Sequence, residues 1–191
     1  TQAMIALDAN VDFGQGYYFA MPQAAPLEIH STIDRATRLW QNYDSEIAEQ
    51  ERRMNERLVP YRKAVADAAA KVAAGLSLAD ACAPFFSLQG AEFCYLLDDE
   101  GRQLGNNVWR PGYVIDRLGE RFKPVVNIPG ARWSRRGYFR SAMDNISSVQ
   151  NTQPYLSSAS ANVCITISLA FRLQGKVCVL CGDVVWDQTP L

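Results

Sequence analysis

Few side chains in this sequence are suited to acid, base or nucleophilic chemistry. Among its 191 residues the sole histidine is His30. A serine or cysteine nucleophile needs a neighbouring base to activate it, and no such pair is visible. Phosphate-binding loops are rich in glycine, whereas Gly130, Gly137 and Gly175 each stand alone. We therefore predict that this chain is not itself an enzyme.

Five cysteines form the other reactive set, and two of them, Cys178 and Cys181, have the CxxC spacing of some metal and redox sites. A metal site there needs two further soft ligands nearby, and His30 is far away in the sequence. The surrounding residues are typical of a strand and not of a helix start. An odd number of cysteines favours a reducing compartment. We expect buried structural thiols in a cytoplasmic protein, without a metal; a metal or redox site is the alternative.

The composition argues against two classes of partner. The net charge is −1, so no basic field attracts nucleic acid or acidic lipid. The longest apolar run, Val163 to Phe171, is much shorter than the ~20 residues that cross a bilayer. With 48% hydrophobic residues the chain can bury one core. The sequence thus predicts a globular domain that binds neither nucleic acid nor membrane.

Apolar residues after Pro26 recur in alternating steps of three and four, a period typical of a left-handed coiled coil. This seam consists of Ile33, Ala36, Trp40, Tyr43, Ile47, Met54 and Tyr61. We predict a helix over 32–59 that dimerises through Ile33, Trp40, Tyr43, Ile47 and Met54. Packing of the helix on its own domain is the alternative. Pro60 predicts a kink or a new start, and a second helix would end at Gly75.

From residue 90 the hydrophobic period changes to that of strands. The predicted strands are 92–97, 102–108, 149–156, 163–173 and 177–186. Gln174-Gly175 is typical of the turn between the last two. Short helices are expected at 77–83 and 138–143. This order favours an α+β fold in which a long N-terminal helix precedes a five-stranded antiparallel sheet.

The segment from Asp12 to Pro22 contains Gln15-Gly16-Tyr17-Tyr18-Phe19. Taken alone, it predicts a turn into a short aromatic strand, as in an ordinary hairpin arm. It also resembles the closing segment of EAL domains, the cyclic di-GMP phosphodiesterases, which typically reads QGY-x-F-x-x-P. The resemblance implies that residues 1–26 are the C-terminal remnant of such a domain and that Gln15 lies on the substrate side of the barrel mouth.

The catalytic machinery of the EAL family precedes this segment. Its metal-binding carboxylates and its catalytic lysine have no counterpart here. Two-metal hydrolysis needs several converging acidic ligands. The resemblance therefore implies a parent phosphodiesterase that uses Mg or Mn, and a remnant that is itself inactive and needs no cofactor.

Several phrases over roughly residues 76–187 resemble Cache and PAS-like sensory domains. They are Tyr95-Leu-Leu-Asp98 with Gly101, Arg136-Gly-Tyr-Phe-Arg-Ser141, Pro154-Tyr-Leu-Ser-Ser158, Cys164-Ile-Thr-Ile-Ser168 and Val179-Leu-Cys-Gly-Asp183. A PAS-like domain behind an EAL domain is known as an EAL-associated signalling domain. The resemblance implies three parts: an EAL remnant at 1–26, a helical connector at 27–75 and a PAS/Cache-like domain at 76–191.

The Cache amino-acid-sensing pattern consists of an arginine, two aromatic residues, a tyrosine and an aspartate. The resemblance assigns these roles to Arg136, Tyr138, Phe139, Tyr155 and Asp183. It implies that the arginine grips a carboxylate, that the aspartate receives an ammonium group and that aromatic rings wall the cavity. Tyr138 and Phe139 replace the usual Trp and Tyr, and Ala131 replaces a further Tyr, so the ligand need not be an amino acid.

Each of these residues also has a purely structural interpretation. Arg136 belongs to a cluster of surface arginines, Tyr155 fits ordinary strand packing, and Asp183 fits a turn at a strand end. A ligand-sized cavity beside Arg136 and Asp183 distinguishes the two interpretations.

Together these patterns predict the regulatory C-terminal region of a bacterial cyclic di-GMP phosphodiesterase. It would form a homodimer, sense a small metabolite such as an amino acid or carboxylate, and signal to its own EAL domain through the helix. The alternative is a ligand-free scaffold that holds two EAL barrels together.

Overall fold

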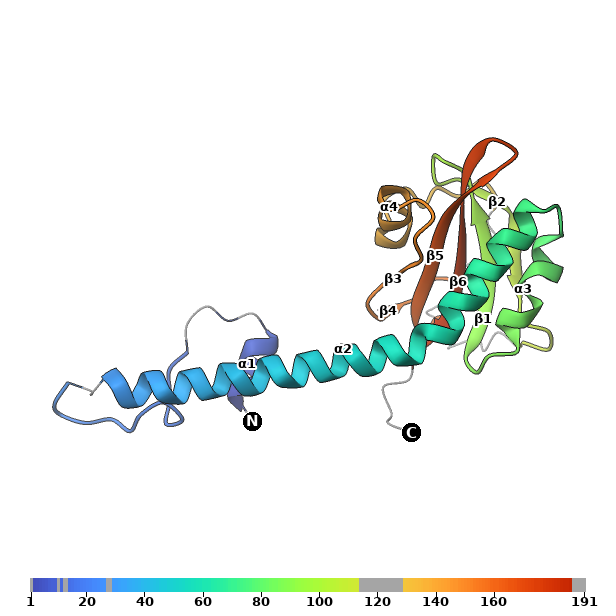
Figure 1. Ribbon diagram of the computed structural model, residues 1–191. Helices are drawn as coiled ribbons and strands as arrows, with labels where there is room; N and C mark the ends of the chain where they lie inside the picture. The colour runs from blue at the N-terminus through green and yellow to red at the C-terminus, as the bar shows by residue number, and fades with distance from the viewer. Residues whose placement is uncertain (1, 10, 12–13, 27–28, 114–128, 187–191) are drawn as a thin grey trace, which may run out of the picture. The chain divides into compact units, whose positions relative to one another are not determined.

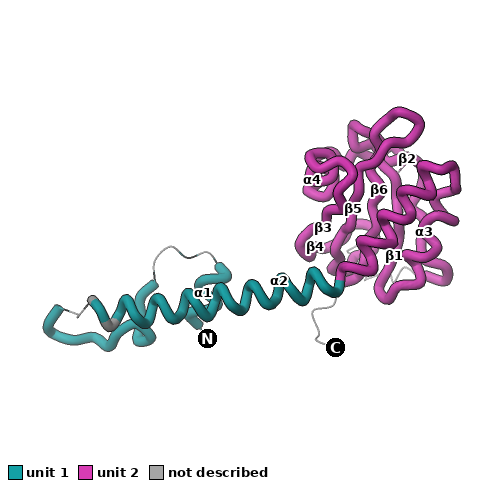
Figure 2. The backbone as a smooth tube through the Cα atoms, in the orientation of Figure 1, with its two compact units in different colours: residues 1–57 teal, residues 58–191 magenta. Residues whose placement is uncertain are grey.

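The computed structural model describes residues 2–9, 11, 14–26, 29–113 and 129–186 (Figure 1). The chain forms two compact units, residues 1–57 and 58–191, and each is described by itself (Figure 2). The long helix α2, Ile29–Ala73, contributes to both. No helix in the described part of the chain is long and apolar enough to span a membrane.

The first unit consists of α1, Gln2–Asp8, the segment after it and the first part of α2. Gln15 to Phe19 does not form the predicted aromatic strand. It forms a turn instead, closed by the amide of Phe19 donating to the carbonyl of Gly16 at 3.0 Å. Arg35 holds this turn against α2 by donating from Nη1 to the Phe19 carbonyl at 3.0 Å. A backbone that spends its polar groups on a turn and a side chain has no partner strand to join.

The expectation of a new helix start at Pro60 is wrong, because α2 continues through it to Ala73. A proline removes one backbone donor and crowds the preceding turn. Packing on both sides offsets that cost, since the side chains of Leu58, Val65 and Ala69 on this stretch are buried.

The second unit is built on one antiparallel sheet in the order β2-β1-β6-β5-β3. The main strands are β1, Ala91–Leu97; β2, Gln103–Trp109; β5, Val163–Leu173; and β6, Lys176–Val185. The last two form the predicted hairpin, in which Gln174 and Gly175 have φ of 50° and 83°. Positive φ at both turn residues suits the twist of the flanking strands. The predicted α+β class is confirmed.

The single strand expected over 149–156 is wrong. Two short strands take its place, β3, Gln150–Asn151, and β4, Tyr155–Leu156, and both pair with β5. Pro154 lies between them and has no amide hydrogen to continue the ladder. The sheet therefore has six strands where five were predicted.

Helices cover both faces of this sheet (Figure 1). The short helix α3, Leu78–Phe86, is capped by Ser77 and continues past its expected end through Pro84. It packs so closely that a Cβ placed on Gly182 of β6 would lie 2.8 Å from the Phe85 ring. On the opposite face lies α4, Gly137–Asp144, which forms a core cluster with the inner side chains of β1 and β6.

All five cysteines are buried free thiols, as predicted. Cys178 and Cys181 both lie on β6, where side chains three residues apart point to opposite faces of the sheet. The CxxC pair therefore cannot converge on one ion. No group of three metal-ligating side chains occurs within the described residues.

Candidate functional site

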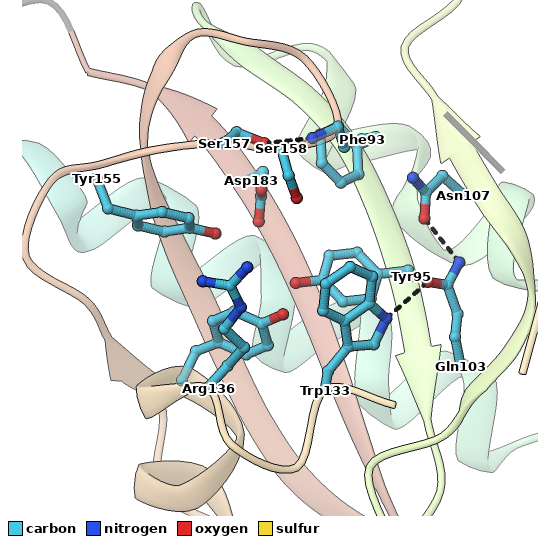
Figure 3. A pocket seen from close by; sticks show the side chains of 12 residues that line it. Phe93, Tyr95, Gln103, Asn107, Trp133, Arg136, Tyr155, Ser157, Ser158 and Asp183 are labelled. Carbon is cyan, nitrogen blue, oxygen red and sulfur yellow. Dashed lines mark hydrogen bonds between the residues drawn. The ribbon is translucent and has the colours of Figure 1, made fainter. Parts of the chain in front are cut away.

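A pocket lies between the sheet and α4, open on one side and enclosing about 380 Å³ when the solvent at its mouth is included (Figure 3). Four of the five residues assigned from the Cache pattern line it, and they come from α4, β4, β6 and the residue before α4. The full lining consists of Phe93, Tyr95, Gln103, Asn107, Trp133, Arg136, Tyr138, Tyr155, Ser157, Ser158, Ala159 and Asp183.

Asp183 occupies the centre of the sheet on β6 and is only 2% exposed. Its cross-strand partners are Phe93 on β1 and Thr166 on β5. The Thr166 hydroxyl donates to Asp183 Oδ1 at 2.7 Å and lies 2.6 Å from the Tyr155 hydroxyl. Because Thr166 has one proton and gives it to the carboxylate, Tyr155 must be the donor to Thr166. This chain of hydroxyls connects the pocket wall to the buried acid.

Burial raises the pKa of Asp183 to about 7, because the site removes the carboxylate from water. The nearby carboxylate of Glu92 raises the pKa further, whereas the hydrogen bonds from Thr166 and Cys164 lower it. No basic side chain lies within ion-pair distance of Asp183 in the described ranges. A cationic group entering the pocket would thus meet an acid that lacks a countercharge.

The raised pKa makes stability depend on pH in a defined direction. An unfolded Asp ionises near pH ~3.9, whereas folded Asp183 keeps its proton up to about pH 7. In this window the unfolded chain binds fewer protons, so the stabilising contribution of Asp183 is complete below pH 4 and is lost as the pH rises through 7. We expect wild type to lose on the order of 4 kcal/mol relative to Asp183→Asn between pH 4 and 8. Urea unfolding of both proteins measures this difference, and parallel profiles would contradict it.

Arg136 is the residue before α4, with an extended backbone at φ −77° and ψ 140°. Its side chain reaches over the pocket, and its guanidinium carbon lies 5.8 Å from the centre of the Trp133 ring (Figure 3). It forms no ion pair within the described residues. The neighbouring arginines behave differently, since Arg132 pairs with Glu100 and Arg140 donates to the Ser134 carbonyl. Arg136 thus differs from the surface cluster in facing the pocket.

Two tyrosines form the aromatic floor of the pocket. Tyr138 and Tyr95 are both buried, and their rings meet edge to face at 6.2 Å. Burial raises the pKa of both hydroxyls well above 10, so both remain protonated hydrogen-bond donors at neutral pH. Phe139, by contrast, is not a lining residue. It packs in the core behind the pocket.

Two residues that the sequence interpretation did not assign, Gln103 and Trp133, fix the far wall. Gln103 is 4% exposed, and its Oε1 accepts from Trp133 Nε1 at 3.0 Å. An indole nitrogen is only a donor, so this bond sets the orientation of the amide. Gln103 Nε2 then donates to Asn107 Oδ1 at 2.8 Å. The wall is held by a chain of bonds with one possible direction.

One sequence signal for this face was present and overlooked. Along β5 the small or polar side chains Cys164, Thr166, Ser168 and Ala170 alternate with large apolar ones. Alternation of period two places them all on one face of the sheet. Ser168 anchors α4 by donating to the Tyr138 carbonyl at 2.9 Å. A stripe of small residues opposite a helix leaves the space that the pocket occupies.

The remaining predicted site residues lie in the first unit. Gln15 is exposed in the turn, while Asp12 and Phe13 lie outside the described residues. Along α2, Ile33 and Trp40 are 52% and 53% exposed. Tyr43, Ile47 and Met54 are half-buried.

Comparisons with known proteins give a fold and no family. No protein-family model matches the chain, and no curated protein matches it in sequence. Among solved structures, the Bacillus subtilis YkuI protein, with an EAL domain and in complex with its substrate c-di-GMP and calcium, superposes with a TM-score of 0.65. The match covers 91% of this chain and 43% of that chain at 19% identity. The two chains share a fold over this stretch.

Chemoreceptor ligand-binding domains also match, at lower TM-scores. The domain of Pseudomonas fluorescens CtaA in complex with L-alanine gives 0.46 at 22% identity, covering 75% of this chain and 59% of that one. The domain of Campylobacter jejuni Tlp3 with 4-methylisoleucine gives 0.44 at 14% identity, covering 72% and 52%. This chain spans about half the length of the structures it matches.

Proposed function

We propose that this chain is a regulatory region of a cyclic di-GMP phosphodiesterase that senses a small metabolite and is not itself catalytic. The QGY-type segment at 15–19 and the fold shared with part of an EAL-domain protein support the connection to that enzyme class. Residues 1–26 would be the end of the catalytic domain, 27–75 the connector and 76–191 the sensor.

The observation that carries the sensing role is the pairing of opposite charges around one pocket. Arg136 presents a guanidinium without a carboxylate partner among the described residues, and Asp183 presents a buried carboxylate without a cation (Figure 3). A small molecule with a carboxylate at one end and an amine at the other satisfies both. The pocket volume suits a ligand of amino-acid size better than a nucleotide.

A polar route runs from the pocket to the connector helix within the second unit. The Thr166 amide donates to Thr152 Oγ1 at 3.0 Å, and the Thr152 amide donates to the Thr166 carbonyl at 3.0 Å. The adjacent Asn151 accepts from the Arg62 guanidinium on α2. A ligand that moves Asp183 and Thr166 would thus act on α2 through a few contacts, provided it binds two arrangements with different affinity.

A thermal-shift screen of the twenty L-amino acids, small carboxylates and small amines tests the sensing role. A ligand that binds only the folded state adds about 2.7 kcal/mol at a hundredfold excess over Kd. At least one compound carrying both an amine and a carboxylate should raise the Tm. Absence of any stabiliser at millimolar concentration would favour the scaffold function instead.

The scaffold function has an observation of its own, the exposed apolar stripe on α2. Ile33 and Trp40 leave large apolar surface in water at a 3.5-residue period. We propose that a second copy of this chain covers the stripe, because that period suits a parallel or antiparallel partner helix. Dimerisation is compatible with sensing and would also serve a chain without a ligand.

Replacing Trp40 by Glu should yield a monomer. The substitution removes a large ring from the centre of the stripe and places a charge where the partner helix would pack. Sedimentation at micromolar concentration measures the state, and Gln41→Glu, which adds the same charge at an exposed neighbouring position, serves as the control. A monomeric wild type, or a dimer that survives in Trp40→Glu, would move the interface elsewhere.

A further inference from the structure

The first strand of the sheet carries an irregularity beside the pocket. Ala91 pairs with Val184 and Phe93 pairs with Asp183, so two steps along β1 correspond to one step along β6. The extra residue is Glu92, and the irregularity is a β-bulge. Successive side chains on a regular strand point to opposite faces. The bulge instead brings Glu92 toward the loop that follows the pocket wall, next to the pocket residue Phe93.

The Glu92 carboxylate is 1% exposed and is held by three neutral donors. Its Oε2 accepts from the Ser160 hydroxyl at 2.8 Å. Its Oε1 accepts from Asn162 Nδ2 and from the Tyr113 hydroxyl, each at 2.5 Å. No ion pair to Glu92 occurs in the described part of the chain. A buried charge is tolerated when donors surround it, and charge-assisted hydrogen bonds are strong ones.

Two of the three donors belong to the 157–162 loop, which forms one wall of the pocket. Ser157, Ser158 and Ala159 line the pocket. The loop closes on itself through the Ser157 amide, which donates to the Asn162 carbonyl at 2.8 Å. Its far end has Ala161 at φ 62°, a conformation that non-glycine residues rarely adopt. The two bonds to Glu92 fix this strained end onto the sheet.

We propose that Glu92 is a positioning residue of the pocket, whose buried carboxylate clamps the 157–162 loop so that its wall residues keep their place. It touches no pocket space itself and acts through Ser160 and Asn162. The inference rests on the proposed function only in taking the pocket as the ligand site. The clamp itself is a property of the ligand-free chain.

Hydrogen exchange of the ligand-free chain tests the clamp. In Glu92→Ala the amides of 157–162 should exchange at least about tenfold faster, while those of the β5–β6 hairpin stay protected, because local opening is separable from global unfolding. Glu92→Gln should restore most of the protection, since its amide accepts from Asn162 and Tyr113 and donates to the Ser160 hydroxyl. Glu100→Ala, which removes an exposed carboxylate, is the control and should change neither region.

Unchanged exchange of 157–162 in a folded Glu92→Ala chain would overturn the proposal. If that variant does not fold, Asn162→Ala removes one donor and should still speed exchange of the loop about threefold or more. Affinity for the strongest stabiliser among the twenty L-amino acids gives the second measurement, with Kd about tenfold weaker in Glu92→Ala and near wild type in Glu92→Gln. If no amino acid binds, the proposed function fails, while the exchange result still decides the clamp.

Discussion

Replacing Arg136 by Ala should abolish most of the ligand affinity without unfolding the chain. A charge-assisted, bidentate contact to a carboxylate contributes about 1.5–3 kcal/mol, which corresponds to roughly a hundredfold in Kd. Arg136 is exposed at the pocket rim and forms no ion pair in the described residues, so its loss removes no structural bond there. Isothermal titration of the variant with the best compound from the screen measures the loss.

The adjacent Arg135 provides the matched control for this prediction. It is exposed, carries the same charge and does not line the pocket. Arg135→Ala should bind within about twofold of wild type, since a solvent-exposed charge contributes little. Arg136→Lys should fall between Ala and wild type, because an ammonium cannot make two parallel bonds. Equal losses in Arg135→Ala and Arg136→Ala would mean that the arginines act only through overall charge.

Gly101→Ala should be the most destabilising single-methyl change near the pocket. Gly101 has φ +76°, and a Cβ there would lie 2.7 Å from the backbone nitrogen of Ser134. Its carbonyl also accepts from the Trp133 amide at 2.7 Å, so the clash would push away the segment that carries Trp133 and Arg136. Strain of about 1 kcal/mol for the left-handed backbone adds to the clash, for a total loss of about 3 kcal/mol or more in unfolding free energy.

Gly105→Ala separates the clash from the backbone strain. Gly105 has φ +78°, but nothing lies within 4 Å of the Cβ that the substitution adds. It should therefore cost only the conformational strain, about 1 kcal/mol. Urea unfolding of the two variants gives the comparison, and equal losses would show that the segment around Ser134 yields easily.

The sequence predicted the elements whose signals are local. The β5–β6 hairpin followed from Gln174-Gly175 between two alternating runs, and α4 and the long helix followed from their periods. The errors at Pro60 and over 149–156 have a common origin. Whether a proline is absorbed, as on α2, or breaks a strand, as Pro154 does, depends on packing partners that are distant in the sequence.

The pocket was predictable only in part. Arg136 and Asp183 were reached through a family resemblance, and the structure places both on one cavity. Thr166 and Gln103 were not, because their roles depend on which strands are neighbours. Glu92 was hidden further, since a bulge changes the face of a single residue and no pattern along the chain marks it.

A crystal structure of the chain with the best compound from the screen tests the central claim most directly. The account predicts density in the pocket, with a carboxylate within hydrogen-bond distance of the Arg136 guanidinium and an amine facing Asp183 and the Tyr155 hydroxyl. An empty pocket at saturating concentration, or a ligand bound elsewhere on the chain, would contradict the sensing function and leave the scaffold as the better explanation.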